Sequence, residues 1–524
     1  MTRKLGLTLA AIGNGLLEKG LPSENLLTKS LSNVTTLGLT MAITIPLGIV
    51  TRIWVPRVLG SKDAGILFFA ESFPIFFMNF MTLGAPYYIQ KFVPPRPEHG
   101  REIFDTISVF GAITATVLAF CLIGFLHSSD YDSLTIHVTA IMIGYQAIQI
   151  YSAEFIQKIF FALGHYSATS VTNILAKAIT ASFVAISLIT FGSVVSVATA
   201  FTLAQSFNLA LLLRLARKNQ LLGGGFQPSL LKPIVLVGLP FLFGGTISTV
   251  NSSVDTFCLA RFANFAELGY YGTSQRVLGL FLMPLPIISQ VFGPLLSRLY
   301  ASQDRAQYSQ ILTDITRAIV VIMGPLAWGL VLFRSEIISL LYGTEFAPAA
   351  LSLILQGPML LLSALSTFFA LSAVTTNSGK SFSLTLMAGA TINIILDCLL
   401  IPLGAHHIGT GGAALGSVLA SVLVVAGEMT IFLVISEYKI VNTPLIKIIL
   451  AGLIPTGLLS ATAIFWEGMS LTIRGIFLAL MSPGYLFALR LVTAKDIARI
   501  SLAARSLWEN LRLSRFSWLQ KSVP

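Results

Sequence analysis

The chain has 524 residues, of which 55% are hydrophobic and 10% are charged, and its mean hydropathy is +0.83. These values exclude an ordinary water-soluble globular protein. A formal net charge of +11 would suggest a nucleic-acid partner for a soluble protein, but in a membrane protein positive charge is judged by its sidedness.

Apolar segments long enough to cross a membrane recur along the whole chain. A helix needs about 20 mostly apolar residues to span the hydrocarbon. Fourteen such segments are centred near residues 41, 74, 115, 146, 178, 202, 244, 280, 324, 360, 392, 421, 456 and 480. Because the runs are continuous rather than alternating, they favour helices over barrel strands. The sequence therefore predicts an all-α polytopic membrane protein with about 14 transmembrane helices.

Lysine and arginine residues concentrate on one side of the predicted membrane. With a cytoplasmic N-terminus, 25 of the 33 fall in cytoplasmic segments, seven fall outside, and Lys177 lies mid-span. Cytoplasmic loops of membrane proteins carry such an excess. We therefore expect both termini in the cytoplasm and an even number of spans.

The spans and the segments between them divide the chain into six regions. The first is an amphipathic segment that we expect on the inner leaflet rather than a cleaved signal peptide. The last is basic and amphipathic and suits anionic lipid, with a disordered tail as the alternative. The regions are the N-terminal segment 1–29, spans 1–6 in 30–214, a basic cytoplasmic linker 215–232, spans 7–12 in 233–436, spans 13–14 in 437–492, and the tail 493–524.

An internal repeat relates the two halves of the chain. Arg57 is followed after eight residues by Gly65, and Arg261 is followed after eight residues by Gly269, an offset of 204 residues between the pairs. Both pairs lie where two spans join through a short polar hairpin. A membrane protein built from two such halves is a candidate transporter with its path between the halves.

Four polar residues form a candidate ion-coupling site. Asn393 and Asp397 are four residues apart and share one helix face. The predicted topology places Asp255 and Ser417 at a similar depth. Such oxygen ligands could hold a hard cation such as Na⁺, and protonation is the other way to neutralise buried acids. In the structural alternative, Asp255 pairs with Arg261 and Asp397 caps its helix.

A second group of polar residues is a candidate substrate-binding site. It comprises Arg52, Glu71, Lys177, Gln275 and Arg276. Ionisable groups inside spans are costly and mark functional positions. Arginine binds phosphate through bidentate hydrogen bonds and lysine acts as a compact charge, so a cavity holding them would attract a pyrophosphate group. The alternative is mutual neutralisation of Glu71 by Arg52 or Arg276 without a ligand.

Several motifs follow one another over nearly the whole chain. They are RVLGSKDAGILFFAES, VDTFCLARFANFAELGYYGTSQRV, SLLYGTEFAPAALSLILQ, NIILDCLLIPLG and IGTGGAALGSVLAS. In order and spacing they resemble the O-antigen and exopolysaccharide repeat-unit flippases of the multidrug/oligosaccharidyl-lipid/polysaccharide exporter superfamily. The resemblance implies two pseudo-symmetric six-helix lobes around a central cavity, plus two C-terminal helices. It also implies a transporter with no catalytic site rather than an enzyme.

The resemblance further implies a substrate and a location. The expected activity is movement of undecaprenyl-pyrophosphate-linked oligosaccharide from the inner to the outer leaflet of the bacterial cytoplasmic membrane by alternating access. In the related lipid II flippases a sodium site uses spans 7, 11 and 12, where the four ion-coupling candidates fall. The expected partners are the lipid-linked substrate, membrane lipids and polysaccharide-assembly membrane proteins, with no nucleic acid. We expect no cofactor beyond a coupling Na⁺ or H⁺.

Three rival functions remain open. Lipid II flippases carry arginines within the first span, whereas TTLGLTMAITIPLGIV has none before Arg52, which argues against lipid II as the substrate. A cation-coupled multidrug antiporter of the same fold would favour an acidic cavity over Arg52, Lys177 and Arg276. A polytopic polysaccharide polymerase or ligase would need a large outer loop with catalytic residues, and the predicted outer loops are short.

Overall fold

The computed structural model describes residues 24–93, 100–163, 166–221, 223–283, 285–376, 379–435 and 443–488. All regular secondary structure in these ranges is helical, which confirms the predicted all-α class. The predicted tail and most of the predicted N-terminal segment lie outside the described residues.

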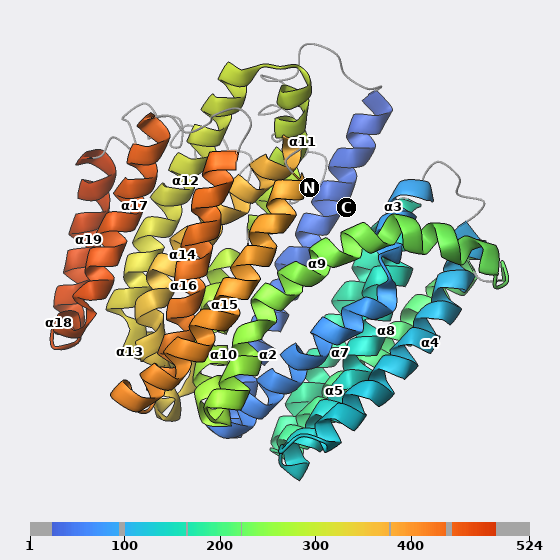
Figure 1. The fold of residues 1–524 in the computed structure, drawn as a ribbon, viewed down its shortest axis with the longest axis horizontal. Coiled ribbons are helices and arrows are strands. Elements are labelled where there is room, and N and C mark those ends of the chain that lie inside the picture. The colour runs from blue at the N-terminus through green and yellow to red at the C-terminus, as the bar shows by residue number, and fades with distance from the viewer. Residues whose placement is uncertain are drawn as a thin grey trace, which may run out of the picture.

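The first half of the chain forms a bundle of long helices (Figure 1, blue to green). Its core packs α2 against α5 and α7, and α7 against α8. The elements are α2 (Glu24–Met78), η1 (Asn79–Thr82), α3 (Ala85–Phe92), α4 (Gly100–His127), α5 (Ser133–Ile150), η3 (Tyr151–Gln157), α6 (Lys158–Ala162), α7 (Tyr166–Thr190) and α8 (Val194–Lys218).

The second half forms another bundle beside the first (Figure 1, green to red). Its core packs α14 against α12 and α16, and α15 against α9 and α16. The elements are α9 (Pro228–Phe262), α10 (Phe265–Leu282), α11 (Leu285–Ala301), α12 (Arg305–Leu332), α13 (Arg334–Tyr342), η4 (Thr344–Phe346), α14 (Ala349–Thr375), α15 (Gly379–Ile408), α16 (Gly412–Ile435), α17 (Thr443–Ala461), α18 (Ala463–Glu467) and α19 (Leu471–Ala488).

Each predicted span centre falls within a helix. Predicted spans 1 and 2 lie on either side of Gly60 within α2, and because Gly60 has a non-helical backbone, with φ 81° and ψ 173°, two helical segments meet there at a kink. Among the described residues, nine helices are long and apolar enough to cross a membrane, and three more apolar helices are shorter. The protein is therefore a multi-pass membrane protein, and the number fourteen stays a prediction.

The two halves touch most closely where α2 crosses α10. A Cβ atom on Gly65 would lie 1.7 Å from the carbonyl oxygen of Phe265, and one on Gly269 would lie 2.1 Å from that of Ser61. Small residues allow such backbone approach between membrane helices. Gly65 and Gly269 are the two glycines related by the sequence repeat, so the repeat brings equivalent backbones together.

Polar contacts reinforce this junction at the end of the molecule where α2 turns back, drawn at the bottom of Figure 1 and called here the hairpin end. Ser61 N donates to Glu345 Oε1 at 2.6 Å, and Arg57 Nη1 donates to the carbonyl oxygen of Leu340 at 2.9 Å. Each bond joins the first half of the chain to the second. The halves are therefore closed against each other at the hairpin end.

Glu267 at the start of α10 fixes the turn before α16. Its carboxylate accepts from Gly411 N at 2.6 Å and from Ala414 N at 3.1 Å. Those amides belong to the beginning of α16, where the first N–H groups have no partner within the helix. An acid there also interacts favourably with the helix dipole. The buried Glu267 thus joins α10 to α16 within the second half.

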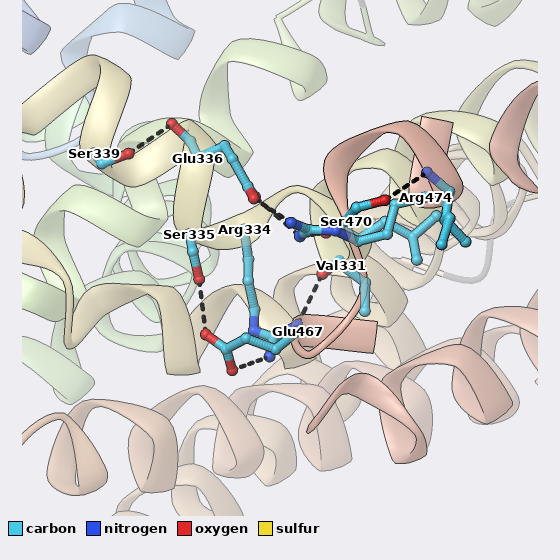
Figure 2. Close-up of polar contacts among 10 residues, drawn as sticks. Val331, Arg334, Ser335, Glu336, Ser339, Glu467, Ser470 and Arg474 are labelled. Carbon is cyan, nitrogen blue, oxygen red and sulfur yellow. Dashed lines mark hydrogen bonds and ion pairs between the residues drawn. The ribbon is translucent and has the colours of Figure 1, made fainter. Parts of the chain in front are cut away.

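Two arginines attach the C-terminal helices to the second half (Figure 2). Arg334 on α13 pairs with Glu467 of α18 at 2.6 Å, and Ser335 donates to the same carboxylate at 3.0 Å. In the second pair the acid is on α13 and the arginine is on α19: Arg474 Nη1 donates to Glu336 at 3.1 Å. Both arginines are buried, so each depends on its acid for compensation.

The segment between the two halves is fastened to the start of α4. Gly223 N and Gly225 N both donate to Asp105 Oδ2, at 3.0 and 2.9 Å, and Gln227 N donates to the hydroxyl of Thr106 at 3.0 Å. The Gly223 and Gly225 backbones have φ of +97° and +78°, which glycine adopts readily. The described part of the predicted linker is therefore bound to the first half up to the start of α9.

Candidate functional site

A buried polar cluster lies where α9, α15 and α16 meet. Asn393 Nδ2 donates to Oδ1 of Asp255, and the Ser421 hydroxyl donates to Oδ2 of Asp255 at 2.7 Å. Asp397 lies near Asp255 and Ser417, close enough to Asp255 for the two carboxylates to interact electrostatically. All five residues are buried. The structure thus brings together the four residues of the predicted ion-coupling site and adds Ser421.

Several oxygens of this cluster are buried without a hydrogen-bond partner. They are both carboxylate oxygens of Asp397, Oδ1 of Asn393 and the hydroxyl of Ser417. A buried, unpaired carboxylate is expensive, so it calls for a proton or a cation. Oxygen donors suit hard cations. Among the described residues there is no group of three or more His, Cys, Asp or Glu side chains that could hold a metal ion.

A tyrosine on α10 connects this cluster to the rest of that helix. The hydroxyl of Tyr271 donates to Oδ2 of Asp255. Gln275 Nε2 in turn donates to the Tyr271 oxygen at 2.7 Å. The structure therefore places Gln275 in the hydrogen-bond chain that leads to Asp255.

The charged residues of the predicted substrate site gather between the two halves. Arg276 on α10 pairs with Glu71 on α2 at 3.2 Å, with side chains 12% and 31% exposed. Its guanidinium carbon also lies 5.6 Å from the centroid of the Phe68 ring. The backbone oxygen of Glu71 accepts from Gln146 Nε2 at 2.8 Å, which secures that part of α2 on α5. One of the two predicted neutralising pairs is therefore formed.

The remaining cations of this set lie around the same carboxylate. Lys177 on α7 is close enough to Arg52 and Glu71 to interact electrostatically with both. Arg52 and Lys177 are exposed residues, although protein atoms surround much of the Lys177 ammonium group. Tyr145 lies near Arg52 and Glu71. Four of the five predicted substrate residues are thus brought together, with three positive charges around one acid.

Sequence reasoning missed the aromatic and hydroxyl partners of both groups. Tyr271 is adjacent to Tyr270 in GYYGT, and only the helix rotation decides which ring faces Asp255. Ser421 lies four residues after Ser417, so it shares a face with a predicted ligand and this spacing could have indicated it. Tyr342 lies near Arg276 and Arg52 from a distant part of the chain, and no sequence signal pointed to it.

Comparison with known families decides the relationship. The family model described as "Polysaccharide biosynthesis protein" matches residues 30–300, just over half of the chain. The chain belongs to this family. None of the curated protein sequences matches the chain. Membership in the polysaccharide biosynthesis protein family is what the motif order led us to expect.

Solved structures show the fold of this polysaccharide biosynthesis family member. The chain is similar to the lipid II flippase MurJ in an inward closed conformation, with TM-score 0.63, 16% identity, and coverage of 86% of this chain and 98% of that one. It is also similar to a multidrug resistance MATE family transporter of the MOP superfamily. The inward-facing conformation gives TM-score 0.62 and 15% identity over 78% of this chain and 99% of that one. The outward-facing one gives 0.53 and 13% over 82% and 97%.

Together these matches give the family and the fold of the chain. The family is one of polysaccharide biosynthesis proteins, and the fold is that of the MurJ and MATE structures. The predicted two-lobe exporter fold is confirmed.

Proposed function

We propose that the protein flips undecaprenyl-pyrophosphate-linked oligosaccharide repeat units from the inner to the outer leaflet of the bacterial cytoplasmic membrane, for O-antigen or exopolysaccharide synthesis. The observation that carries this proposal is the charge between the halves. Arg52 and Lys177 from the first half and Arg276 from the second surround Glu71. An excess of positive charge in that place suits a pyrophosphate. The family match supports a precursor of polysaccharide.

The Glu71–Arg276 pair suggests how substrate binding changes the arrangement of the halves. The pair joins α2 to α10 across the interface. A pyrophosphate would compete with Glu71 for the guanidinium, because arginine donates to phosphate in a bidentate manner. A substrate that takes Arg276 away from Glu71 binds the open and closed arrangements differently, as alternating access requires. The polyprenyl tail would stay in lipid meanwhile.

The proposed orientation in the membrane rests on the charge distribution along the sequence. Residues that would be cytoplasmic with an inside N-terminus carry 25 of the 33 lysines and arginines. In that topology the hairpin end faces outward, and the segment bound by Asp105 lies in the cytoplasm. The closed hairpin end then corresponds to a state that shuts the substrate off from the outer side.

Cation coupling is the second part of the proposal. The unpartnered oxygens of Asp397, Asn393 and Ser417 beside Asp255 would bind Na⁺, or the acids would take up a proton. Either event removes one negative charge from two neighbouring buried carboxylates. The set lies in the second half and contacts α10, the helix that also carries Arg276. Ion binding can thereby favour one arrangement of the halves over the other.

Alternative functions with the same fold require different side chains between the two halves. A multidrug antiporter would bind cationic compounds, and the three positive side chains around Glu71 disfavour them. A lipid II flippase shares the pyrophosphate but has arginines within its first span. Here the corresponding apolar run, residues 35–50, contains no arginine, and the first one follows it at Arg52. The charge pattern therefore favours a repeat-unit flippase.

One leaflet-resolved assay tests the proposal. In cells lacking this protein and any redundant flippase, lipid-linked repeat units should accumulate in the inner leaflet and disappear from the outer one. Arg276→Ala should restore export far less than wild type at equal amounts of folded protein in the membrane. Arg261→Ala, an exposed arginine beside the hairpin turn, is the matched control and should restore export. Unchanged outer-leaflet exposure in the deletion strain would refute the function.

A further inference from the structure

One face of α10 connects the Asp255 cluster with the charged residues between the halves. Tyr271 and Gln275 are four residues apart and share this face. The Tyr271 hydroxyl donates to Asp255, and Gln275 donates to the Tyr271 oxygen. The next residue, Arg276, pairs with Glu71 in the other half of the chain. Two sets of polar contacts, one to α9 and one to α2, are therefore carried by neighbouring residues of α10.

The Tyr271 hydroxyl occupies a position that a cation at Asp255 would need. Oδ1 of Asp255 accepts from Asn393, and Oδ2 accepts from both Tyr271 and Ser421. The neighbouring Asp397 has no such donor. A cation bound to Oδ2, or a proton on it, removes an acceptor that Tyr271 now uses. The two states of the cluster thus differ in whether Tyr271 is held.

Tyr271 differs from the other two donors to Asp255 in the helix to which it belongs. Asn393 and Ser421 belong to α15 and α16, which pack closely against each other in the second half. Tyr271 belongs to α10, which crosses α2 at Gly65 and Gly269. Releasing Tyr271 therefore affects the helix at the junction of the halves, whereas releasing the other donors affects only the interior of one half.

We propose that Tyr271 is a positioning residue that conveys the occupancy of the cation site to the junction between the halves. While its hydroxyl donates to Asp255, Tyr271 holds α10 on α9 and keeps Arg276 in register with Glu71. A cation or proton at Asp255 displaces the hydroxyl, and α10 becomes free to shift away from α2. This role rests on the cation-coupled part of the proposed function.

The first test measures ion binding to the purified full-length protein. Tyr271→Phe removes the hydroxyl and keeps the ring. Tyr270→Phe is the matched control, because Tyr270 is the adjacent buried tyrosine and its ring packs against Phe346. Na⁺ affinity is taken from the shift of the unfolding midpoint with NaCl, with KCl as reference, and repeated over a range of pH. Loss of the competing hydrogen bond should tighten Na⁺ or proton binding about tenfold in Tyr271→Phe. Tyr270→Phe should match wild type.

The second test separates binding from its consequence. Spin labels at Ser128→Cys and Thr410→Cys, both exposed at the hairpin end in opposite halves, report the distance between the halves once Cys121, Cys258 and Cys398 are replaced. In wild type and Tyr270→Phe the distance should change with Na⁺ or with pH. In Tyr271→Phe it should no longer respond, although the ion binds.

The outcomes test the role of Tyr271 separately from the identity of the transported substrate. A Tyr271→Phe protein whose distance still follows Na⁺ or pH as in wild type would overturn the role, as would an unaltered affinity. A wild-type distance that responds to neither Na⁺ nor pH would overturn it too. A normal distance response without flipping of lipid-linked oligosaccharide would instead refute the proposed substrate and leave the role of Tyr271 intact.

Discussion

Adding one methyl group at the crossing of α2 and α10 should open the hairpin end. In Gly65→Ala the new Cβ would lie 1.7 Å from the Phe265 carbonyl oxygen and 2.9 Å from Gly269 N. A carbon and an oxygen in contact are about 3.3 Å apart, so the helices must separate by roughly 1.6 Å at this point. Both neighbours are backbone atoms and cannot turn aside. We expect a cost of about 1–3 kcal/mol, as for overpacked cores.

The separation should be visible both as lost stability and as a longer distance. The unfolding midpoint of Gly65→Ala should fall, and the distance between spin labels at residues 128 and 410 should increase. Gly279→Ala on α10 is the matched control, because no other atom lies within 4 Å of its added Cβ. Alanine favours helix over glycine, so this control should be neutral or stabilising. A Gly65→Ala protein that matches the control in both measurements would show that the crossing does not close the hairpin end.

Two further substitutions probe the buried acids. Asp397→Asn removes one of two neighbouring buried carboxylates, so its unfolding midpoint should not fall below that of wild type, while the shift produced by NaCl or by acid should disappear. A retained ion-dependent shift would count against the cation site. Glu267→Gln weakens the bonds to Gly411 N and Ala414 N and removes a charge from the beginning of α16, which should cost about 1–2 kcal/mol and speed hydrogen exchange at those amides. Exposed Asp130→Asn is its control, and equal exchange in the two proteins would contradict the capping role.

The sequence was informative about the cation cluster because position along a span sets the depth of a residue and residue spacing sets its helix face. Asn393 and Asp397 share a face by spacing alone, and the topology sets the level of Asp255 and Ser417. The structure places all four together. Their use as ion ligands stays a prediction. The rotation of α10 was not readable from one apolar sequence, which is why Gln275 was grouped with Arg276 although it points to Tyr271.

The repeat was the other informative signal. Gly65 and Gly269 were recognised as equivalent from spacing, and the structure shows why both are glycine, since each backbone blocks the Cβ of the other helix. The helix count was harder to predict. Hydropathy marks apolar length but not helix breaks, so it could not show that the two helical segments of α2 meet at the non-helical Gly60. Contacts such as Tyr342 near Arg276 depend on packing between remote segments.

The attachment of the segment before α9 has a mechanical consequence. Asp105 and Thr106 bind that segment to the first half, and Gly238 still touches Gly84 of the same half. Further along the same helix, Asp255 is hydrogen-bonded into the second half. Any rotation of one half against the other must therefore be absorbed by bending within residues 239–254 of α9. That part of one helix acts as an elastic joint between the two halves, and its stiffness sets how far and how easily they can swing.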